Sequence, residues 1–201
     1  MFIKSINPGF ANKPNFYGIG APCLYIEFGY QNNGEEIDLQ RLRSIVFRSH
    51  LKLVYIDILI HPYDEEFDEF LTLLSCDGYN ILINTLNGQI IEDYRHIRNL
   101  HFTVELQGDN IDVDDIECLI SFFHRLDKDD YLLIIIDDEV TYEKIKNEDI
   151  NRFHCQIGVG TSCRYGEWLR GKHLSSRFEK PVFYYVPNLW EMVEPNSNFL
   201  K

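Results

Sequence analysis

Residues 54–88 read VYIDILIHPYDEEFDEFLTLLSCDGYNILINTLNG, and this stretch decides the fold class. It opens and closes with an apolar run, and between the runs Phe67, Phe70, Leu71 and Leu74 follow the spacing i, i+3, i+4, i+7. That spacing predicts an amphipathic helix, and short runs rich in Ile, Val and Tyr predict strands. The stretch therefore predicts a strand–helix–strand unit, which joins two parallel strands.

The same alternation continues along the chain and predicts an α/β fold with a mostly parallel sheet. There are too few units for a closed eight-fold barrel, so we expect an open or partial (β/α) barrel. Residues 161–201 are irregular and rich in aromatic and basic side chains, and we expect a C-terminal appendage there, packed on a domain of residues 1–160. Strands are predicted at 23–28, 53–60, 80–86, 101–106, 131–137, 153–159 and 181–186, and helices at 38–48, 67–74, 116–123 and 139–147.

The composition is acidic. The 201 residues carry 19 Lys and Arg against 32 Asp and Glu, a net charge of −13. Such a charge disfavours nucleic acids and anionic membranes as partners. No apolar run approaches the roughly 18–20 residues of a membrane span, and the N-terminal stretch lacks the apolar core of a secretion signal. We therefore expect a cytoplasmic protein.

Five cysteines occur, an odd number without paired spacing, which argues against a disulfide framework. No two of them are separated by two or three residues, so the common zinc and iron–sulfur loops are missing. We expect most of them to be small buried side chains. They are Cys23, Cys76, Cys118, Cys155 and Cys163.

Residues 18–38, GIGAPCLYIEFGYQNNGEEID, resemble the opening of radical-SAM enzymes of the 7-carboxy-7-deazaguanine synthase type. That family has a Gly-rich turn, a strand and then G-C-x3-C-x2-C-D. Gly29 and Asp38 match the residues that flank the cluster loop, but the three cysteine positions hold Tyr30, Gly34 and Ile37. An iron–sulfur cluster needs thiolates, which these side chains do not offer. The resemblance thus implies a degenerate radical-SAM scaffold without its cluster.

The resemblance extends over roughly residues 15–160 and rests on element order and register. The turn that receives the methionine end of SAM in the family reads LIHP at 59–62 here, and the family's E-T-x-G reads NTLNG at 84–88. Formation of the deoxyadenosyl radical needs an electron from the cluster. The resemblance therefore implies a protein with no cofactor and favours a non-enzymatic role over an enzymatic one.

Two functions from different classes follow. The first is a non-catalytic, pseudoenzyme subunit that acts by protein–protein interaction, as a heteromer or, like the family's dimers, a homodimer, with a partner from deazapurine chemistry or phage defence. The second is a cluster-free binder or enzyme for a purine-like or nucleotide ligand. Strand ends and turns would line its remnant pocket, through His61, Asn84, Thr85, Asp137 and Asp138.

For the first function we expect an interface in the C-terminal segment, where we expect the only basic cluster of this acidic chain. Arg, Tyr and Trp are frequent anchors of protein interfaces; the alternative is a solvated loop that offsets the chain's own negative charge. The predicted interface residues are Arg164, Tyr165, Trp168, Arg170 and Trp190.

Two smaller groups of residues leave alternatives open. Asp137, Asp138 and Glu139 follow a strand end and would either hold a divalent cation or cap the next helix. Asp57 and His61 would form a general base only if both lay on one face of the strand; a structural histidine is the plainer interpretation. We predict no metal site and no catalytic residue.

Overall fold

A single mixed sheet carries the fold of the computed structural model, which describes residues 1–13, 15–58, 65–85, 89–106, 125–136, 154–161 and 182–185. The nine strands follow the order β3-β1-β2-β4-β5-β6-β7-β8-β9, and the two outermost strands do not pair, so the sheet is open. From β2 to β9 all neighbours are parallel; β1 is antiparallel to both β2 and β3. The strands are β1 (Phe2–Phe10), β2 (Pro22–Phe28), β3 (Glu35–Glu36), β4 (Leu53–Ile58), β5 (Asn80–Thr85), β6 (Leu100–Leu106), β7 (Tyr131–Ile136), β8 (Gln156–Thr161) and β9 (Val182–Tyr185).

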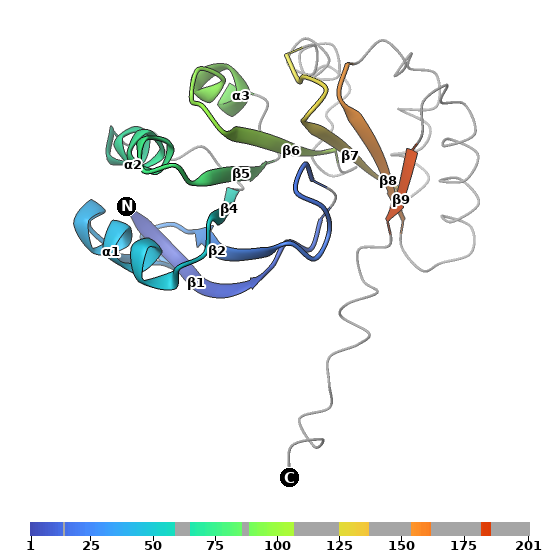
Figure 1. The fold of residues 1–201 in the computed structure, drawn as a ribbon. Coiled ribbons are helices and arrows are strands. Elements are labelled where there is room, and N and C mark those ends of the chain that lie inside the picture. Colours follow the sequence, from blue (N-terminus) through green and yellow to red (C-terminus); the bar gives the residue numbers. More distant parts are fainter. Residues whose placement is uncertain are drawn as a thin grey trace.

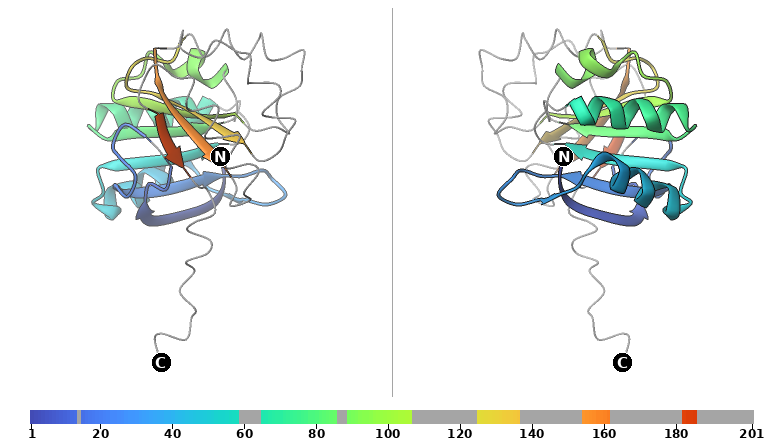
Figure 2. Two further views of the ribbon diagram at one scale, coloured as in Figure 1. Left: turned by 90° about the vertical axis from the view of Figure 1, so that its right-hand side faces the viewer. Right: turned by 90° about the vertical axis from the view of Figure 1, so that its left-hand side faces the viewer.

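Among the described residues, three helices cover one face of this sheet: α1 (Leu39–Ser49), α2 (Glu65–Cys76) and α3 (Gln89–Tyr94). In Figure 1 the sheet follows an arc with the helices on its outer side, and both side views of Figure 2 place them on the same face. None of the helices in the described ranges combines the length and the apolar character that crossing a membrane requires. The predicted α/β class with a mostly parallel sheet is confirmed.

The helix ends follow the local sequence. Asp38 precedes α1, and its carboxylate accepts a hydrogen bond from the backbone N–H of Arg41 at 2.7 Å, as an N-cap does. The acidic residues at the start of α2 favour the positive end of its dipole. Beyond α2, Gly78 adopts φ +73°, the left-handed conformation that ends helices and suits glycine.

Three elements in the described ranges were not predicted: β1, the two-residue β3, and α3. Strand β1 contains Pro8, which has no N–H to give to a sheet. The structure accommodates it because β3 pairs only with Phe2 and Ile3, so that further along β1 is an edge strand. Helix α3 has six residues, too few for a clear helical period. The predicted helices at 116–123 and 139–147 lie outside the described residues.

Strand alternation gives the sheet two different faces, which we call the helix face and the inner face. On β4, Val54, Ile56 and Ile58 belong to the core beneath the helices, together with Phe67 and Phe70 of α2. The inner face carries the alternate residues and joins a separate cluster of buried side chains. Its members on the central strands include Tyr25, Glu27, Tyr55, Asp57, Leu82, Asn84, Thr103 and Glu105.

Candidate functional site

A row of polar side chains crosses the inner face near the carboxyl ends of the central strands. The register pairs Glu27 of β2 with Asp57 of β4, Asp57 with Asn84 of β5, and Asn84 with Thr103 of β6. Asn84 is only 1% exposed and Thr103 is fully buried. Open parallel sheets bind their ligands outside the carboxyl ends of the strands, so this row is the candidate functional site.

Asp57 is the centre of the row. Its Oδ2 accepts a hydrogen bond from the Tyr25 hydroxyl at 2.8 Å, and its Oδ1 accepts one from Nδ2 of Asn84 at 3.1 Å. Burial, together with the charge of Asp57, raises the pKa of Tyr25, so that the phenol stays protonated and acts as a donor. Within the described ranges no Lys or Arg forms an ion pair with Asp57. Its carboxylate is held by two neutral donors.

The amide oxygen of Asn84 has no hydrogen-bond partner in the part of the chain that the structure describes. Because the carboxylate of Asp57 can only accept, it fixes Nδ2 of Asn84 towards itself and turns Oδ1 the other way. This Oδ1 is buried and receives no hydrogen bond from the residues that the structure describes. A buried acceptor without a donor costs about 1–3 kcal/mol, so the site is arranged to receive an N–H or O–H group from a ligand.

The connection between β1 and β2, residues 11–21, passes over the inner face, opposite the helices (Figure 1). Lys13 of this connection forms an ion pair with the buried Glu105 of β6. The Phe16 ring stacks on His101 with centroids 4.3 Å apart, and Tyr17 meets the same imidazole edge-on at 5.5 Å. Burial lowers the pKa of His101 and raises that of Tyr17 to about 12. The connection is therefore held on β6 by two aromatic rings that pack on His101 and by the ion pair of Lys13 with Glu105.

Charge on the inner face is nearly balanced. Glu27 forms an ion pair with Lys4, and Glu105 forms one with Lys13. Asp57 is the third acid of this face and lacks such a cation among the residues that are described. The site thus combines one negative charge with an open amide acceptor, which suits a neutral or cationic ligand rich in hydrogen-bond donors.

The structure describes two of the five residues predicted to line a pocket, Asn84 and Thr85. Asn84 lies in the polar row, whereas Thr85 is one residue further along β5, so alternation turns it to the opposite face of the sheet. Asp57, considered in the sequence only beside His61, contacts Asn84 and Tyr25 instead. The other predicted residues lie outside the described ranges: His61, Asp137, Asp138, Arg164, Tyr165, Trp168, Arg170 and Trp190.

Tyr25 and the Asp57–Asn84 pair were not recognised as a unit from the sequence. Each is a polar side chain in a mostly apolar strand, which was a usable signal in the sequence. These residues lie at the same level of the sheet because of the register of three parallel strands, and this register could not be predicted from the sequence.

Residues 29–37, which the sequence analysis compared with a cluster loop, pack closely on β1: the Gly29 N–H donates to the Phe2 carbonyl at 3.0 Å and the Ile37 N–H to the Met1 carbonyl at 2.9 Å. Tyr30 is 45% exposed, whereas Ile37 is 5% exposed and belongs to the core. A Cβ on Gly34 would come within 3.2 Å of the Ile3 backbone nitrogen. Tyr30, Gly34 and Ile37 therefore have three different environments: Tyr30 is exposed, Gly34 lies against β1, and Ile37 belongs to the core. In the described part of the chain, no group of three His, Cys, Asp or Glu residues has the geometry of a metal site.

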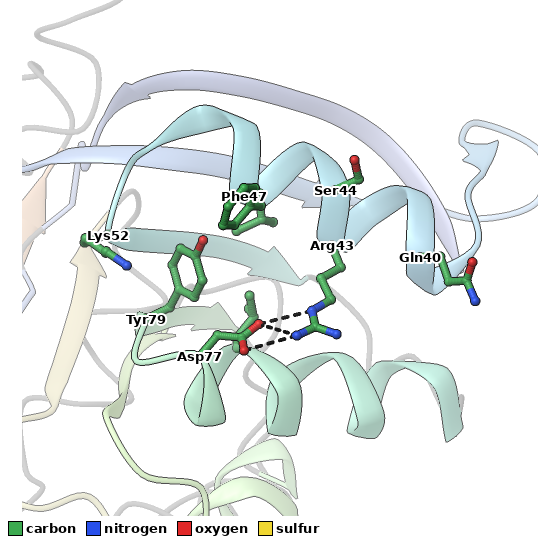
Figure 3. A pocket seen from close by; sticks show the side chains of 9 residues that line it. Gln40, Arg43, Ser44, Phe47, Lys52, Asp77 and Tyr79 are labelled. Atoms are coloured by element: carbon green, nitrogen blue, oxygen red, sulfur yellow. Dashed lines mark hydrogen bonds and ion pairs between the residues drawn. The ribbon is translucent and has the colours of Figure 1, made fainter.

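Contrary to the expectation, the basic cluster predicted in the C-terminal segment is not the only basic stretch of the sequence; its interface residues lie outside the described ranges. Residues 39–56, which span α1 and most of β4, contain four Arg or Lys and no Asp or Glu. An open pocket of about 610 Å³ lies beside α1 (Figure 3). Its lining residues come from α1, α2 and the segments that follow them: Gln40, Arg43, Ser44, Val46, Phe47, Lys52, Leu74, Asp77 and Tyr79.

Comparison of the chain with models of known protein families, with curated proteins and with solved structures gives no match. The polar row on the inner face and the pocket beside α1 are therefore the features from which function can be argued.

Proposed function

We propose that this chain is a radical-SAM-like protein, a degenerate relative of the 7-carboxy-7-deazaguanine synthase type, and that its sheet is a partial barrel of that kind. The succession β2-α1-β4-α2-β5-α3-β6 along the chain supports this proposal, as do the parallel pairing and the arc of the sheet (Figure 1). The absence of any helix of membrane-spanning character in the described ranges is compatible with a cytoplasmic location, which we include in the proposal.

The protein works without radical chemistry in this proposal. Its support is the chemistry of the cluster loop: a phenol, a glycine and a buried isoleucine occupy the ligand positions, and none is a thiolate. Ile37 contributes to the core, so a cysteine there would face apolar side chains rather than its partners in the loop.

The function that the inner face supports best is binding, without iron, of a purine-like ligand or of the neutral base of a nucleotide whose phosphates lie away from Asp57. The observation that carries it is the buried Oδ1 of Asn84, which is oriented by Asp57 and receives no donor from the described residues. Purine-like rings present N–H and amino groups along one edge, which match this acceptor and the neighbouring carboxylate. Tyr25 supports the site by holding Asp57 in place.

A thermal-shift panel of purine bases, deazapurines and nucleotides tests this function. Ligand at a hundredfold excess over its Kd adds about 2.7 kcal/mol, which raises the Tm of a chain of this size by roughly 5–10 °C. Asn84→Leu should abolish the shift. The matched control is Asn80→Leu, four residues earlier on the same strand and face, which should leave the shift intact.

Two results would overturn the ligand-binding function. One is a flat response of the wild-type protein across the whole panel. The other is a shift that survives in Asn84→Leu, because such a ligand would bind elsewhere on the chain.

A second candidate function is the pseudoenzyme subunit, which acts through a protein partner as a heteromer or homodimer. The observation in its favour is the exposed Phe47, whose side chain is 71% exposed on α1 in the middle of the acid-free stretch. Co-purification from the native host would test it. A stoichiometric complex supports the role, and a protein that elutes alone at native concentration rejects it.

A further inference from the structure

We propose that the pocket between α1 and α2 is a docking groove for an acidic segment of a partner protein that carries an aromatic or large apolar side chain. This inference deepens the partner-subunit role and rests on it. It assigns that role to residues other than the C-terminal cluster predicted from the sequence.

Polar side chains form the walls of the groove, and nearly covered apolar side chains lie beneath it. Val46 of α1 and Leu74 of α2 are each 1% exposed and Tyr79 beside them is 6% exposed, so this floor is apolar but of small accessible area, and most of the exposed apolar surface at the groove belongs to Phe47. Phe47 stands at the rim and is 71% exposed, the most exposed of the large hydrophobic residues in the described ranges. An exposed phenylalanine next to a pocket with an apolar floor provides both a ring and a cavity for a partner's side chain.

The two cations of the groove differ in their partners: Arg43 has a carboxylate, whereas Lys52 has an aromatic ring. Arg43 binds Asp77 in a bidentate ion pair, in which Nε donates to Oδ2 at 3.1 Å and Nη2 donates to Oδ1 at 3.1 Å (Figure 3). Lys52 lies over the Tyr79 ring, with Nζ 4.7 Å from the centroid, and forms no ion pair with a described carboxylate. Arg43, Lys52 and Asp77 together leave one positive charge in the groove, and the ammonium of Lys52 is exposed to receive an acid.

This local charge is opposite to that of the whole chain. The protein carries −13, yet no acid occurs between Leu39 and Ile56. At physiological ionic strength charges are screened beyond about 8 Å, so an approaching segment senses the groove rather than the net charge. A basic arginine near the end of α1 also suits the helix dipole. That preference accounts for Arg48 but not for an exposed phenylalanine or for Lys52, which lies beyond the helix.

A protein segment fits this groove better than a nucleic acid does. The ion pair with Asp77 already neutralises Arg43, which leaves Lys52 as the one unneutralised cation among the residues that line the groove, whereas a phosphate backbone carries a charge on every nucleotide and needs several cations. An acidic peptide needs only one cation for its carboxylate and a cavity for its side chain, and Lys52 and the apolar floor supply both.

Selection from a display library of random short peptides against the full-length protein tests the proposal. The selected peptides should be acidic and should contain an aromatic or large aliphatic residue. Phe47→Ala and Lys52→Glu should each weaken a selected peptide about tenfold or more in a fluorescence-anisotropy titration. Asp77→Asn removes the acid from the wall and frees Arg43, so it should tighten binding.

The matched control is Phe10→Ala, which removes another exposed phenylalanine (68% exposed) on β1 and should leave peptide affinity unchanged. Each variant must keep the wild-type Tm. Failure to select any peptide overturns the groove proposal, as does selection of neutral or basic peptides, or equal affinity in all variants. Tighter binding of single-stranded nucleic acid than of the selected peptides also overturns it.

The groove and the subunit role fail in different ways. A cellular complex that forms undiminished with Phe47→Ala and Lys52→Glu rejects the groove and leaves the role standing. Acidic peptides that bind at the groove of a protein without any cellular partner would support the groove and reject the role.

Discussion

The two faces of the same sheet differ in what their strands present. On the helix face, Ile56 of β4, Ile83 of β5 and Phe102 of β6 are fully buried and apolar. On the inner face the same strands present Asp57, Asn84 and Glu105. Both sets are at least partly buried, so exposure to water does not account for the difference.

Apolar packing on the helix face and polar side chains on the inner face have opposite effects on the free energy of unfolding. Packing apolar side chains stabilises the fold by about 1.5–3 kcal/mol for each large residue. A buried polar group without a partner destabilises it by about 1–3 kcal/mol. Asn84 retains such a group although an apolar residue would fit the strand pattern. A feature that reduces stability is expected where function requires it. By this criterion the helix face is structural and the inner face is the candidate functional face.

The largest effect should come from the helix face. Phe67→Ala removes a fully buried ring that packs edge-on against Phe28 and Tyr94, with centroids 5.0 and 5.4 Å away. We expect a loss of about 3–5 kcal/mol in the free energy of unfolding, measured by urea denaturation. Phe47→Ala, at an exposed helical phenylalanine, should change it by less than about 0.5 kcal/mol. Similar losses in the two variants would contradict the assignment of the core.

The helix face could be predicted from the sequence because each of its elements repeats a known period. The spacing of Phe67, Phe70, Leu71 and Leu74 marks the buried side of α2, and these four residues are the ones that the structure buries. Strand ends were placed within about two residues for β2, β4, β5, β6 and β7. Local sequence patterns are enough to predict an element whose packing depends on apolar residues at regular spacing.

The inner face could be predicted only in part. Asn84 was expected in a pocket from its place at a strand end, but its partner Asp57 lies 27 residues away in the chain. Their contact depends on strand register, which hydrophobic patterns leave open when both faces of a strand are covered. The basic stretch at 39–56 was not predicted as a site, and the sequence does not show that Arg41 and Arg43 pair with Glu35 and Asp77 while Lys52 stays without a described carboxylate.

A smaller effect should come from Asn84→Leu on stability, as distinct from ligand binding. The substitution removes the unpartnered oxygen and also one of the two donors to Asp57, and these changes oppose each other. We expect the free energy of unfolding to change by less than about 1 kcal/mol in urea denaturation. A loss as large as that of Phe67→Ala would mean that Asn84 holds the fold together rather than serving a site.

The smallest effect should come from His101, on the inner face beneath Phe16. Burial lowers its pKa below the usual value near 6.5, although Asp127, Asp129 and Asp130 act in the opposite direction. The unfolded chain therefore binds a proton more readily than the folded one as the pH falls through about 6.5. The contribution of His101 to stability is present above that pH and is lost below it.

Urea midpoints at pH 7.5 and 5.5 would measure this dependence. His101→Phe keeps an aromatic ring against Phe16 and should lose less stability on acidification than the wild type. Because solvent screens a half-buried imidazole, the difference should be roughly a few tenths of a kcal/mol. Phe16→Ala should act in the same direction, since it returns water to the imidazole and brings its pKa towards the ordinary value. An imidazole resonance of His101 that titrates above 6.5 by NMR would show that the three aspartates outweigh burial, and that the connection over the inner face does not keep water from this histidine.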